Sequence, residues 1–550
     1  MLSTYAYPEF PYVPSEEQRT GRRVRHPVVV VGAGPVGLTA ALDCAHHGVP
    51  VVVLDDNSTV SVGSRAVCYA KRPLEIWDRL GCAQRLLDKG VIWKNGKVFR
   101  HDRLIYQFDL LPEDGHRMPA FINLQQYYLE EYLIDHAHGF DDRVDLRWKH
   151  QVADITPAGD HVRLTVETPD GFFDMEADWA IACDGARSDI REALDLPFAG
   201  QAFQDRFLIT DVVMKADFPA ERWFWFDPPF HRGQSVLLHM QADNVWRIDF
   251  QLGMEADPEQ EKRPERVIPR LKRMLGEDTA FDLEWVSVYQ FACRRLEDFR
   301  HGRVLFAGDA AHQVSPFGAR GANTGIQDVD NLIWKLALVL RGQAPERLLD
   351  SYSEERVLAA RENLLTSTRS TDFISPKSTV SRAFRDATLD LAEHLPFARP
   401  LVNSGRLSRP TPYTGSSLNT ADTEPFTGAP PPGTNAADAP VTAEGAPDWL
   451  LRHLGDRFVA LLFLGEETAP PPDHTGTMAA LAAQDVPIHV VTVGRRAGDL
   501  VDGAGLAHER YDATAGTTVL VRPDQVIAGR WRGPDPARLA TARDRAIARA

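Results

Sequence analysis

The stretch VVVVGAGPVGLTAALDCAHHGVPVVVLDD, residues 28–56, decides the fold of this 550-residue chain. An apolar run leads into a glycine-rich turn, a helical segment ends at Gly48, and a second apolar run reaches Asp55. Apolar runs that bracket a helical segment in this way predict a strand, a helix and a second strand. The stretch is therefore predicted to be a compact βαβ unit.

The turn inside this unit predicts a dinucleotide site. It reads GAGPVG, with Gly32, Gly34, Pro35 and Gly37. Glycine lets the backbone approach a pyrophosphate, and the positive N-terminus of the helix favours its charge. Asp55 follows Gly37 by 18 residues, and Asp56 comes next. A carboxylate there can bind ribose hydroxyls but would repel a 2′-phosphate, so FAD or NAD fits and NADP does not.

Two further motifs follow predicted strands. ACDG at 182–185 contains Asp184 and Gly185, and by itself it more often marks an ordinary turn. Gly308 and Asp309 open a glycine-rich stretch, GDAAHQVSPFGARGAN, that leads into a helix expected from about 324 to 341. The N–H groups at such a helix start can face an electron-rich flavin edge. Together the three motifs are much more specific than any one of them.

Composition excludes several function classes. The chain has 61 Lys and Arg against 77 Asp and Glu, a net charge of −16, which repels nucleic acid. The longest apolar stretch, residues 28–42, is broken by glycine and proline and is too short to span a bilayer. The five cysteines are scattered without a CxxC pair, which indicates reduced thiols in a cytoplasmic protein. No metal-binding motif is expected.

Changes in pattern along the chain divide it into six segments. Alternating strands interrupt the α/β pattern after about residue 200, and a Pro-, Thr- and Ala-rich stretch follows the helical region. The last segment reads as strands around a helix near 475–484. The predicted segments are an N-terminal arm at 1–26, a FAD-binding domain at 27–199, a substrate-binding sheet domain at 200–292, the return of the FAD-binding domain with a helical segment at 293–408, a linker at 409–447 and a small α/β domain at 448–550.

On these motifs the chain resembles the class A flavoprotein monooxygenases, the family of para-hydroxybenzoate hydroxylase, phenol hydroxylase and 3-(3-hydroxyphenyl)propionate hydroxylase. The resemblance covers nearly the whole chain. It implies an α/β fold with a para-hydroxybenzoate-hydroxylase-like, Rossmann-type FAD-binding domain and an inserted β-sheet substrate domain. TTVLVRPDQVIAGRW at 517–531 is similar to the C-terminal thioredoxin-like domain of the phenol hydroxylase branch. Without CxxC, that domain is expected to support packing or a homodimer.

The resemblance also assigns residues to the cofactor. The GxGxxG turn would hold the FAD pyrophosphate, the acidic residue the adenosine ribose, and the DG motif both FAD and the nicotinamide cofactor. The GD motif and its downstream loop would lie along the ribityl chain and the flavin ring. Arg65 resembles the family arginine at the FAD phosphates, with a plain surface arginine as the alternative. The expected cofactor-binding residues are Gly32, Gly34, Pro35, Gly37, Asp55, Asp56, Arg65, Gln125, Asp184, Gly185, Gly308, Asp309, Pro316, Gly318, Gly321, Ala322 and Asn323.

The family further implies a reaction. NAD(P)H reduces FAD, oxygen adds to give a flavin C4a-hydroperoxide, and a phenolic ring takes up one oxygen atom. A protein group that polarises the phenol is expected, because phenolate is the better nucleophile. His239 in SVLLHM and Tyr289 in WVSVYQF are the catalytic candidates, although each has a buried structural role as its alternative. Arg247 and Asp249 share a strand face, where a cross-strand ion pair is the simpler interpretation.

Other functions stay open at this stage. A related FAD-dependent epoxidase, dehydrogenase or reductase acting on a non-phenolic substrate would carry the same motifs. A flavin-binding protein without turnover is a further alternative, which the intact GARGAN loop at 318–323 disfavours. The choice between NADH and NADPH cannot be read from the sequence, because it contains no second nucleotide-binding βαβ unit.

Overall fold

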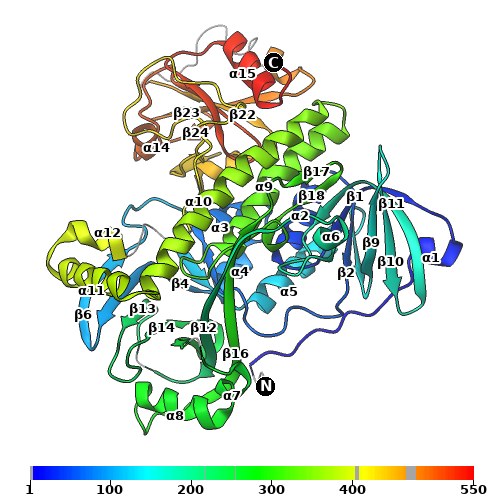
Figure 1. Cartoon of the computed structure of the whole chain (residues 1–550). Coiled ribbons are helices and arrows are strands. Elements are labelled where there is room, and N and C mark those ends of the chain that lie inside the picture. The colour runs from blue at the N-terminus through cyan, green and yellow to red at the C-terminus, as the bar shows by residue number, and fades with distance from the viewer. Residues whose placement is uncertain (1–3, 217, 254, 403–407, 466–478) are drawn as a thin grey trace.

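The predicted βαβ unit lies at the centre of the structure, a computed structural model that describes residues 4–216, 218–253, 255–402, 408–465 and 479–550 (Figure 1). Strand β1 (Arg25–Val31), helix α2 (Pro35–His46) and strand β2 (Val51–Asp55) follow one another as the sequence predicts. The two strands pair in parallel and their apolar residues are buried. The first element of the fold prediction is therefore confirmed.

Parallel pairing brings the sequence motifs to one edge of this first sheet. Its parallel strands run in the order β18 (Val304–Phe306), β11 (Gly171–Ala182), β1, β2 and β8 (Val144–Trp148). The segments that leave β1, β2, β11 and β18 carry the glycine turn, Asp55, the DG motif and the GD motif. In such open α/β sheets, ligands bind outside the carboxyl ends of the strands.

Helices cover this sheet and supply the core of the FAD-binding domain. The long helix α9 (Gly321–Leu340) packs against α2, and its residues Ile326, Val329 and Ile333 are fully buried, as their helical spacing predicts. The other elements of this region are α1 (Glu16–Thr20), α3 (Lys71–Arg79), α4 (Ala83–Lys89), α5 (Gln126–Ala137), α6 (Asp189–Ala193), β9 (Gln151–Pro157), β10 (Val162–Thr168), β17 (Arg300–His301) and α10 (Asp350–Ile374).

A second sheet provides the substrate side. Its order is β19-β16-β12-β15-β14-β13-β5-β6, and it joins strands from three distant parts of the chain. Helix α8 (Pro264–Leu275) packs its Val267 and Leu271 on one face, which we call the outer face. The strands are β5 (Asn95–Arg100), β6 (Arg103–Asp109), β12 (Ala199–Val213), β13 (Arg222–Phe226), β14 (Ser235–Met240), β15 (Val245–Leu252), β16 (Asp282–Arg295) and β19 (His312–Gln313).

The opposite, inner face of this sheet is turned toward the FAD-binding domain. A small sheet of β3 (Cys68–Ala70), β7 (Phe121–Asn123) and β4 (Val91–Trp93) contacts it, because Asn123 bonds to His239 and to the Met240 carbonyl. Helices α7 (Pro258–Glu261), α11 (Thr379–His394) and α12 (Arg399–Val402) complete this part of the molecule. The small sheet and the substrate-side sheet therefore meet where β7 contacts β14.

The C-terminal part forms a third sheet, at the top of Figure 1. Its order is β21-β20-β24-β23-β22-β25-β26. The stretch 409–447 contributes strand β20 and buries Tyr413 against the FAD-binding domain. Of the helix expected near 475–484, residues 475–478 lie outside the described part. The elements are β20 (Pro440–Ala443), β21 (Ala446–Trp449), β22 (Phe458–Phe463), β23 (Ile488–Gly494), β24 (Leu500–Val501), α14 (Leu506–Arg510), β25 (Thr518–Val521), β26 (Ile527–Trp531) and α15 (Pro536–Ala546).

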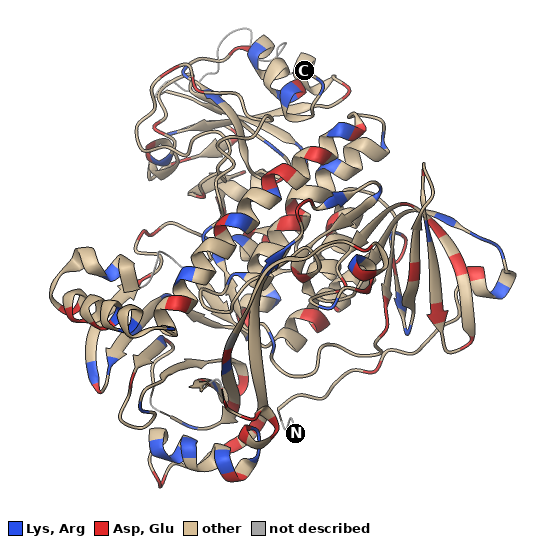
Figure 2. Ribbon diagram, viewed as in Figure 1, with Lys and Arg blue, Asp and Glu red and all other residues tan. Residues whose placement is uncertain are grey.

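A buried ionic network joins the C-terminal sheet to α9 and α10, two helices on which Figure 2 shows both acidic and basic residues. Arg522 donates to both oxygens of Glu355 at 2.7 and 3.0 Å and also pairs with Asp524. Lys335 bonds to the same glutamate at 2.9 Å. Burial alone would raise the pKa of Glu355, but Arg522 and Lys335 together lower it, while burial lowers the pKa of Lys335 to about 8. Each of these buried charges depends on its partners, because removing one would leave the others without a counter-charge.

We expect Arg522→Ala to destabilise the protein by about 3–5 kcal/mol, since it leaves buried carboxylates without their counter-charge. Chemical unfolding followed by circular dichroism measures the change. Arg538→Ala is the matched control, because Arg538 forms an exposed pair with Asp535 and its loss is expected to stay within about 0.5 kcal/mol. If both substitutions changed the free energy of unfolding by the same small amount, the stabilising role of the network would be contradicted.

Candidate active site

The glycine turn is shaped by close backbone contacts. Gly32 has φ +101°, and a Cβ atom there would lie 2.6 Å from the Cys183 carbonyl oxygen of the neighbouring DG segment. A Cβ on Gly37 would lie 1.9 Å from the Gly32 oxygen, so only glycine allows this approach of helix to strand. At Gly34 the same atom would meet open space. The turn is thus closed on its inner side and open toward a ligand.

Two helix N-termini meet beside this turn. Gly34 precedes Pro35 at the start of α2, and Arg320 precedes the start of α9; neither helix has a side-chain cap in the described structure. The two helices pack closely, because a Cβ on Gly325 would lie 3.0 Å from the Gly308 Cα and 2.7 Å from Val36. N–H groups without intrahelical partners therefore gather at one place, which favours a phosphate or an electron-rich ring.

The acidic residues after β2 border the same turn. Asp55 accepts hydrogen bonds from the Ala33 N–H at 2.6 Å and the Asn57 N–H at 2.8 Å. Burial, reinforced by the nearby Asp55 carboxylate, raises the pKa of Asp56. The Asp55 carboxylate thus lies directly beside the glycine turn, where the prediction of a ribose contact requires it.

The DG motif carries a buried polar atom that lacks a partner. Asp184 Oδ2 accepts hydrogen bonds from Ser188 Oγ at 2.9 Å and the Ile190 N–H at 3.1 Å. Its Oδ1 is buried and has no hydrogen-bond partner among the described residues. Burial raises the pKa of this carboxyl group. Gly185 follows with φ +80°. An oxygen of this kind is expected to bind a ligand group, since leaving it unpaired is costly.

One buried carboxylate fixes the position of the GD motif through hydrogen bonds. Asp328 on α9 accepts hydrogen bonds from the Gly308 N–H at 3.0 Å, from His312 Nε2 at 2.7 Å and from Arg356 Nε at 2.6 Å. Burial would raise its pKa, but His312 and Arg356 lower it. Asp309, in contrast, is accessible to solvent, yet desolvation raises its pKa. The Asp309 carboxyl group is therefore open to solvent or to a bound ligand, while the protein around it disfavours its charged form.

The loop after the GD motif leads to the N-terminus of α9. Asn323 is buried: its Oδ1 accepts from the Ala70 N–H at 2.7 Å, and its Nδ2 donates to the Cys68 oxygen at 2.8 Å. The Asn323 side chain thus joins α9 to β3. The remaining predicted loop residues stay accessible: Pro316 is exposed, and Gly318, Gly321 and Ala322 are half-buried.

Arg65 and the glutamines at the start of α5 lie at the other side of the site. Arg65 is exposed, and its carbonyl oxygen accepts from Arg247 at 3.3 Å. Gln125 is fully buried and donates to the Ala242 oxygen at 3.0 Å on the substrate side. The adjacent Gln126, which the sequence analysis did not single out, accepts from the Ala66 N–H at 2.9 Å. Gln126 therefore anchors the segment that carries Arg65.

The residues present fit FAD. An open glycine turn, two uncapped helix N-termini and the unpartnered Asp184 oxygen converge at the carboxyl edge of a parallel sheet. The pyrophosphate would bind at the start of α2, the adenosine ribose at Asp55, and the flavin along the GD motif and the start of α9. The individual contacts of the predicted residues stay predictions.

An aromatic group joins the substrate sheet to the loop before α9. Phe317, from the loop before α9, packs on Phe207 and Phe291 with ring centres 4.9 and 5.6 Å apart. The ring centres of Tyr289 and Phe291 are 5.4 Å apart, and the Tyr289 side chain is 47% exposed. Partial burial nevertheless raises the pKa of Tyr289; the charge of Asp309 raises it further, whereas Arg65 lowers it. Tyr289 is thus close to both FAD-side residues and stays protonated.

His239, the other predicted catalytic residue, lies deeper on the inner face. It is buried, and its Nδ1 lies 3.2 Å from Asn123 Nδ2 and 3.6 Å from Cys68 Sγ. Burial, with Arg222 and Arg247 nearby, holds its pKa well below the usual value. His239 is therefore a neutral side chain and not a charged one at physiological pH.

Arg247 and Asp249 share the inner face, as period two predicts, but the ion pair differs from the expectation. Arg247 Nε donates to Asp211 on β12 at 2.9 Å, and Asp249 forms no ion pair with any described residue. The sequence cannot show this, because both carboxylates are compatible with strand geometry and only the register of β12 against β15 selects Asp211.

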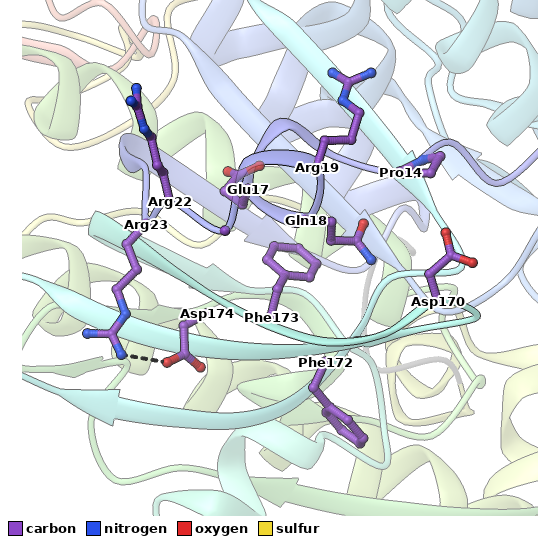
Figure 3. Close-up of a pocket in the computed structure, with 11 residues that line it drawn as sticks. Pro14, Glu17, Gln18, Arg19, Arg22, Arg23, Asp170, Phe172, Phe173 and Asp174 are labelled. Atoms are coloured by element: carbon purple, nitrogen blue, oxygen red, sulfur yellow. Dashed lines mark hydrogen bonds and ion pairs between the residues drawn. The ribbon is translucent and has the colours of Figure 1, made fainter.

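An open recess of about 610 Å³ lies between α1 and β11 (Figure 3). Arg23 reaches Asp174 there at 2.9 Å, and Glu17 is held by His26 and Arg147. Its lining shares no residue with the predicted FAD set. We therefore attach no cofactor to it.

The described part of the chain contains neither a membrane-spanning helix nor a cluster of metal-binding side chains. No helix there is long and apolar enough to cross a membrane. Within the same ranges no group of three or more His, Cys, Asp or Glu residues could hold a metal ion.

Comparisons with known proteins agree with this geometry. Residues 25–367 match the family model described as FAD binding domain. The chain is 36% identical over 351 residues to 6-methylpretetramide 4-monooxygenase of Streptomyces rimosus, covering 62% of this chain and 61% of that relative. It is 28% identical over 526 residues to a 3-(3-hydroxy-phenyl)propionate/3-hydroxycinnamic acid hydroxylase of Mycolicibacterium smegmatis, covering 91% and 90%. The crystal structure of the flavin-dependent monooxygenase PieE shares the fold, with a TM-score of 0.81 at 21% identity over 96% of this chain and all of that one.

The family model spans more than half of the chain, so the chain belongs to the FAD-binding family of class A flavoprotein monooxygenases. It is an FAD-dependent monooxygenase.

We expect Gly37→Ala to lose most of its bound FAD, because the added methyl group would collide with the Gly32 carbonyl and displace α2 from β1. The flavin-to-protein ratio of the purified protein, taken from its visible spectrum, measures the effect. Gly139→Ala is the control, since a Cβ at Gly139 meets open space and the backbone there is helical. Full flavin retention by Gly37→Ala would refute the close approach.

Proposed function

We propose that this enzyme hydroxylates a phenolic aromatic ring with NAD(P)H and O₂. The observation that carries the proposal is the aromatic group of Phe207, Tyr289, Phe291 and Phe317, which joins the inner face of the substrate sheet to the loop that leads to the start of α9, where the flavin would bind. Flat aromatic walls suit a flat aromatic substrate, because offset and edge-to-face ring contacts stabilise it. Relatives named as hydroxylases of hydroxyphenyl compounds support the same substrate class.

The protein's part in such a reaction is to bind, orient and exclude water. FAD, when bound, supplies the electrons from NAD(P)H and transfers one oxygen atom of O₂ to the ring. Phe207, Phe291 and Phe317 keep water from the reacting edge, and the Tyr289 hydroxyl can donate a hydrogen bond, since its raised pKa keeps it protonated. The ring would lie between this wall and the polar residues of β14 and β15.

The nicotinamide cofactor is proposed to bind only transiently. The GxGxxG turn of the first sheet would be taken by FAD, and Asp184 and Gly185, next to it, would serve both cofactors. The unpartnered Asp184 oxygen supports this role, because it is free to accept a hydrogen bond from a ribose hydroxyl.

For the C-terminal part we propose a thioredoxin-like domain that supports the FAD-binding domain and a homodimer. Its β22 and β23 are parallel, and β25, β26 and α15 follow as an antiparallel hairpin and a helix, which is the order of that fold. The Arg522–Glu355 contact supports a packing role. We also place the enzyme in the cytoplasm, where NAD(P)H is supplied and its cysteines, all of them free, stay reduced.

The test of the function is oxidation of NADH and NADPH by the purified holoenzyme against a panel of phenols, hydroxybenzoates, hydroxyphenylpropionates and larger polycyclic phenols. We expect at least one phenol to accelerate NAD(P)H oxidation and to leave as a ring-hydroxylated product, identified by mass spectrometry. Matched compounds that carry a methoxy group in place of the hydroxyl serve as controls and are expected to stay unconverted. A flavoprotein that converts none of the phenols but oxidises a non-phenolic compound would replace the proposal by the alternative FAD chemistry.

A further inference from the structure

We propose that His239 and Asp249 together bind the phenol hydroxyl of the substrate: His239 Nε2–H donates to its oxygen, and Asp249 Oδ1 accepts its proton. The inference rests on the proposed function and names the groups that activate the ring. It assigns the catalytic base to a residue that the sequence analysis read only as one half of an ion pair.

The tautomer of His239 follows from a chain of hydrogen bonds. The Trp93 indole N–H, which can only donate, bonds to Asn123 Oδ1 at 2.7 Å, so the amide orientation is determined. Asn123 Nδ2 then donates to the Met240 carbonyl at 2.8 Å and to His239 Nδ1 at 3.2 Å. Nδ1 is therefore an acceptor, and the proton of the neutral ring is on Nε2.

That Nε2–H group is buried and has no hydrogen-bond partner within the described residues. The Cys68 thiol, 3.6 Å from Nδ1, adds a second donor on the same side of the ring and leaves Nε2 unaffected. A buried donor without a partner costs free energy that a ligand oxygen would recover. His239 thus offers a hydrogen bond, whereas the prediction from sequence allowed it to act as a base.

Asp249 offers the complementary acceptor. Its Oδ1 is buried and unpartnered among the described residues. Across the sheet it is flanked by Leu237 on β14 and Ile209 on β12, so both of its direct cross-strand neighbours are apolar. A carboxyl group in such a position is unusual unless it meets a polar ligand.

Both groups face the same way. On β14 and β15 the residues Leu238, Ile248 and Phe250 pack into the outer-face core with α8, so the alternating residues His239 and Asp249 lie on the inner face. His239 pairs with Arg247 in the register, and Arg247 is two positions from Asp249, which makes His239 and Asp249 diagonal neighbours on adjacent strands. Donor and acceptor can therefore reach one hydroxyl group.

The charged groups around this pair favour a phenolate. Arg222 on β13 forms no ion pair with the described residues; it contacts the Cys68 sulfur at 3.6 Å, while Arg247 on β15 is bound to Asp211 on β12. Burial raises the pKa of Asp249 to about 6, with Arg247 and Arg222 lowering it and Asp211 raising it. A base with this pKa is deprotonated at neutral pH and can still hold a proton in a site that excludes water.

The step transfers one proton. The phenol O–H bond breaks, its proton forms a bond to Asp249 Oδ1, and the electron pair stays on the phenol oxygen, which His239 Nε2–H then stabilises. The ring becomes more electron-rich at its ortho and para positions, where the oxygen atom adds. A free phenol has a pKa of about 10, so the neighbouring donor and cations are needed to lower it toward that of the base.

The first test is Asp249→Asn, which keeps the shape and an acceptor oxygen but removes the base. We expect kcat/KM for an unactivated phenol to fall about 100-fold at neutral pH, the usual scale for general base catalysis. The activity of the wild type should fall as the pH is lowered through about 6. The activity of the variant should not show this fall, and should instead rise as the pH approaches the pKa of the phenol. Asp282→Asn, at an exposed position on β16, is the control and should leave the profile unchanged.

A series of ring-fluorinated phenols separates a base from a structural residue. The deficit of Asp249→Asn should shrink as the phenol becomes more acidic, because the substrate then ionises without help. A deficit that is the same for every phenol, or a variant that keeps wild-type kcat/KM and its acid limb, would overturn the assignment. FAD content and the visible spectrum of each variant establish that the holoenzyme is intact.

His239 is tested by a pair of variants. His239→Gln keeps an N–H donor near the Nε2 position and should retain a substantial part of the activity, whereas His239→Phe removes it and should lose about tenfold or more. Equal activity of the two would refute the donor role.

A measurement on the wild type tests the proposal even if a variant does not fold. A substrate phenol whose ionised form absorbs at longer wavelength should show more phenolate when it binds at a pH between 6 and its own pKa. Binding without that change would overturn the proposal. If the wild type hydroxylates no phenol at all, the proposed function fails, whereas normal hydroxylation by Asp249→Asn defeats this inference alone.

Discussion

The buried carboxylate of Asp328 is the constraint on which the cofactor side of the structure depends. It accepts hydrogen bonds from the backbone of Gly308, from His312 and from Arg356, and so joins the GD motif to α9 and α10. Those two attachments set where the N-terminus of α9 lies relative to the glycine turn of α2. A carboxylate with three donors in a protein interior is both rigid and costly to disturb, because each partner would be left unsatisfied.

Buried charged groups also attach the C-terminal sheet to the rest of the molecule. Arg522 and Glu355 are fully buried, and Glu355 lies on the helix that also carries Arg356. Consecutive residues of α10 thus connect to the C-terminal part on one side and to the GD motif on the other. Arg356 also donates to the Tyr413 hydroxyl in the segment that leads to the C-terminal sheet. The C-terminal part therefore helps to hold α10, whose Arg356 bonds to Asp328.

Other buried polar groups are used differently. The carboxylates of Asp328 and Glu355 are satisfied, whereas Asp184 on the cofactor side and Asp249 and His239 on the substrate side each keep one buried atom without a partner among the described residues. Satisfied groups hold the framework, and at these three positions a ligand group would supply the missing hydrogen bond. In the proposed function, the aromatic residues Phe207, Phe291 and Phe317 would keep water away from the ring that reacts.

By itself the sequence determined the βαβ unit, its dinucleotide site and the meeting of the GxGxxG, DG and GD motifs, because these depend on local periodicity and on glycines at defined spacing. It also placed Arg247 and Asp249 on one strand face. Only the tertiary structure decided that Arg247 pairs with Asp211, that Gln126 anchors the segment of Arg65, and that His239 carries its proton on Nε2. These outcomes depend on strand register and on contacts between residues distant in the chain, 60 positions for Ala66 and Gln126 and 116 for Asn123 and His239, which no local pattern encodes.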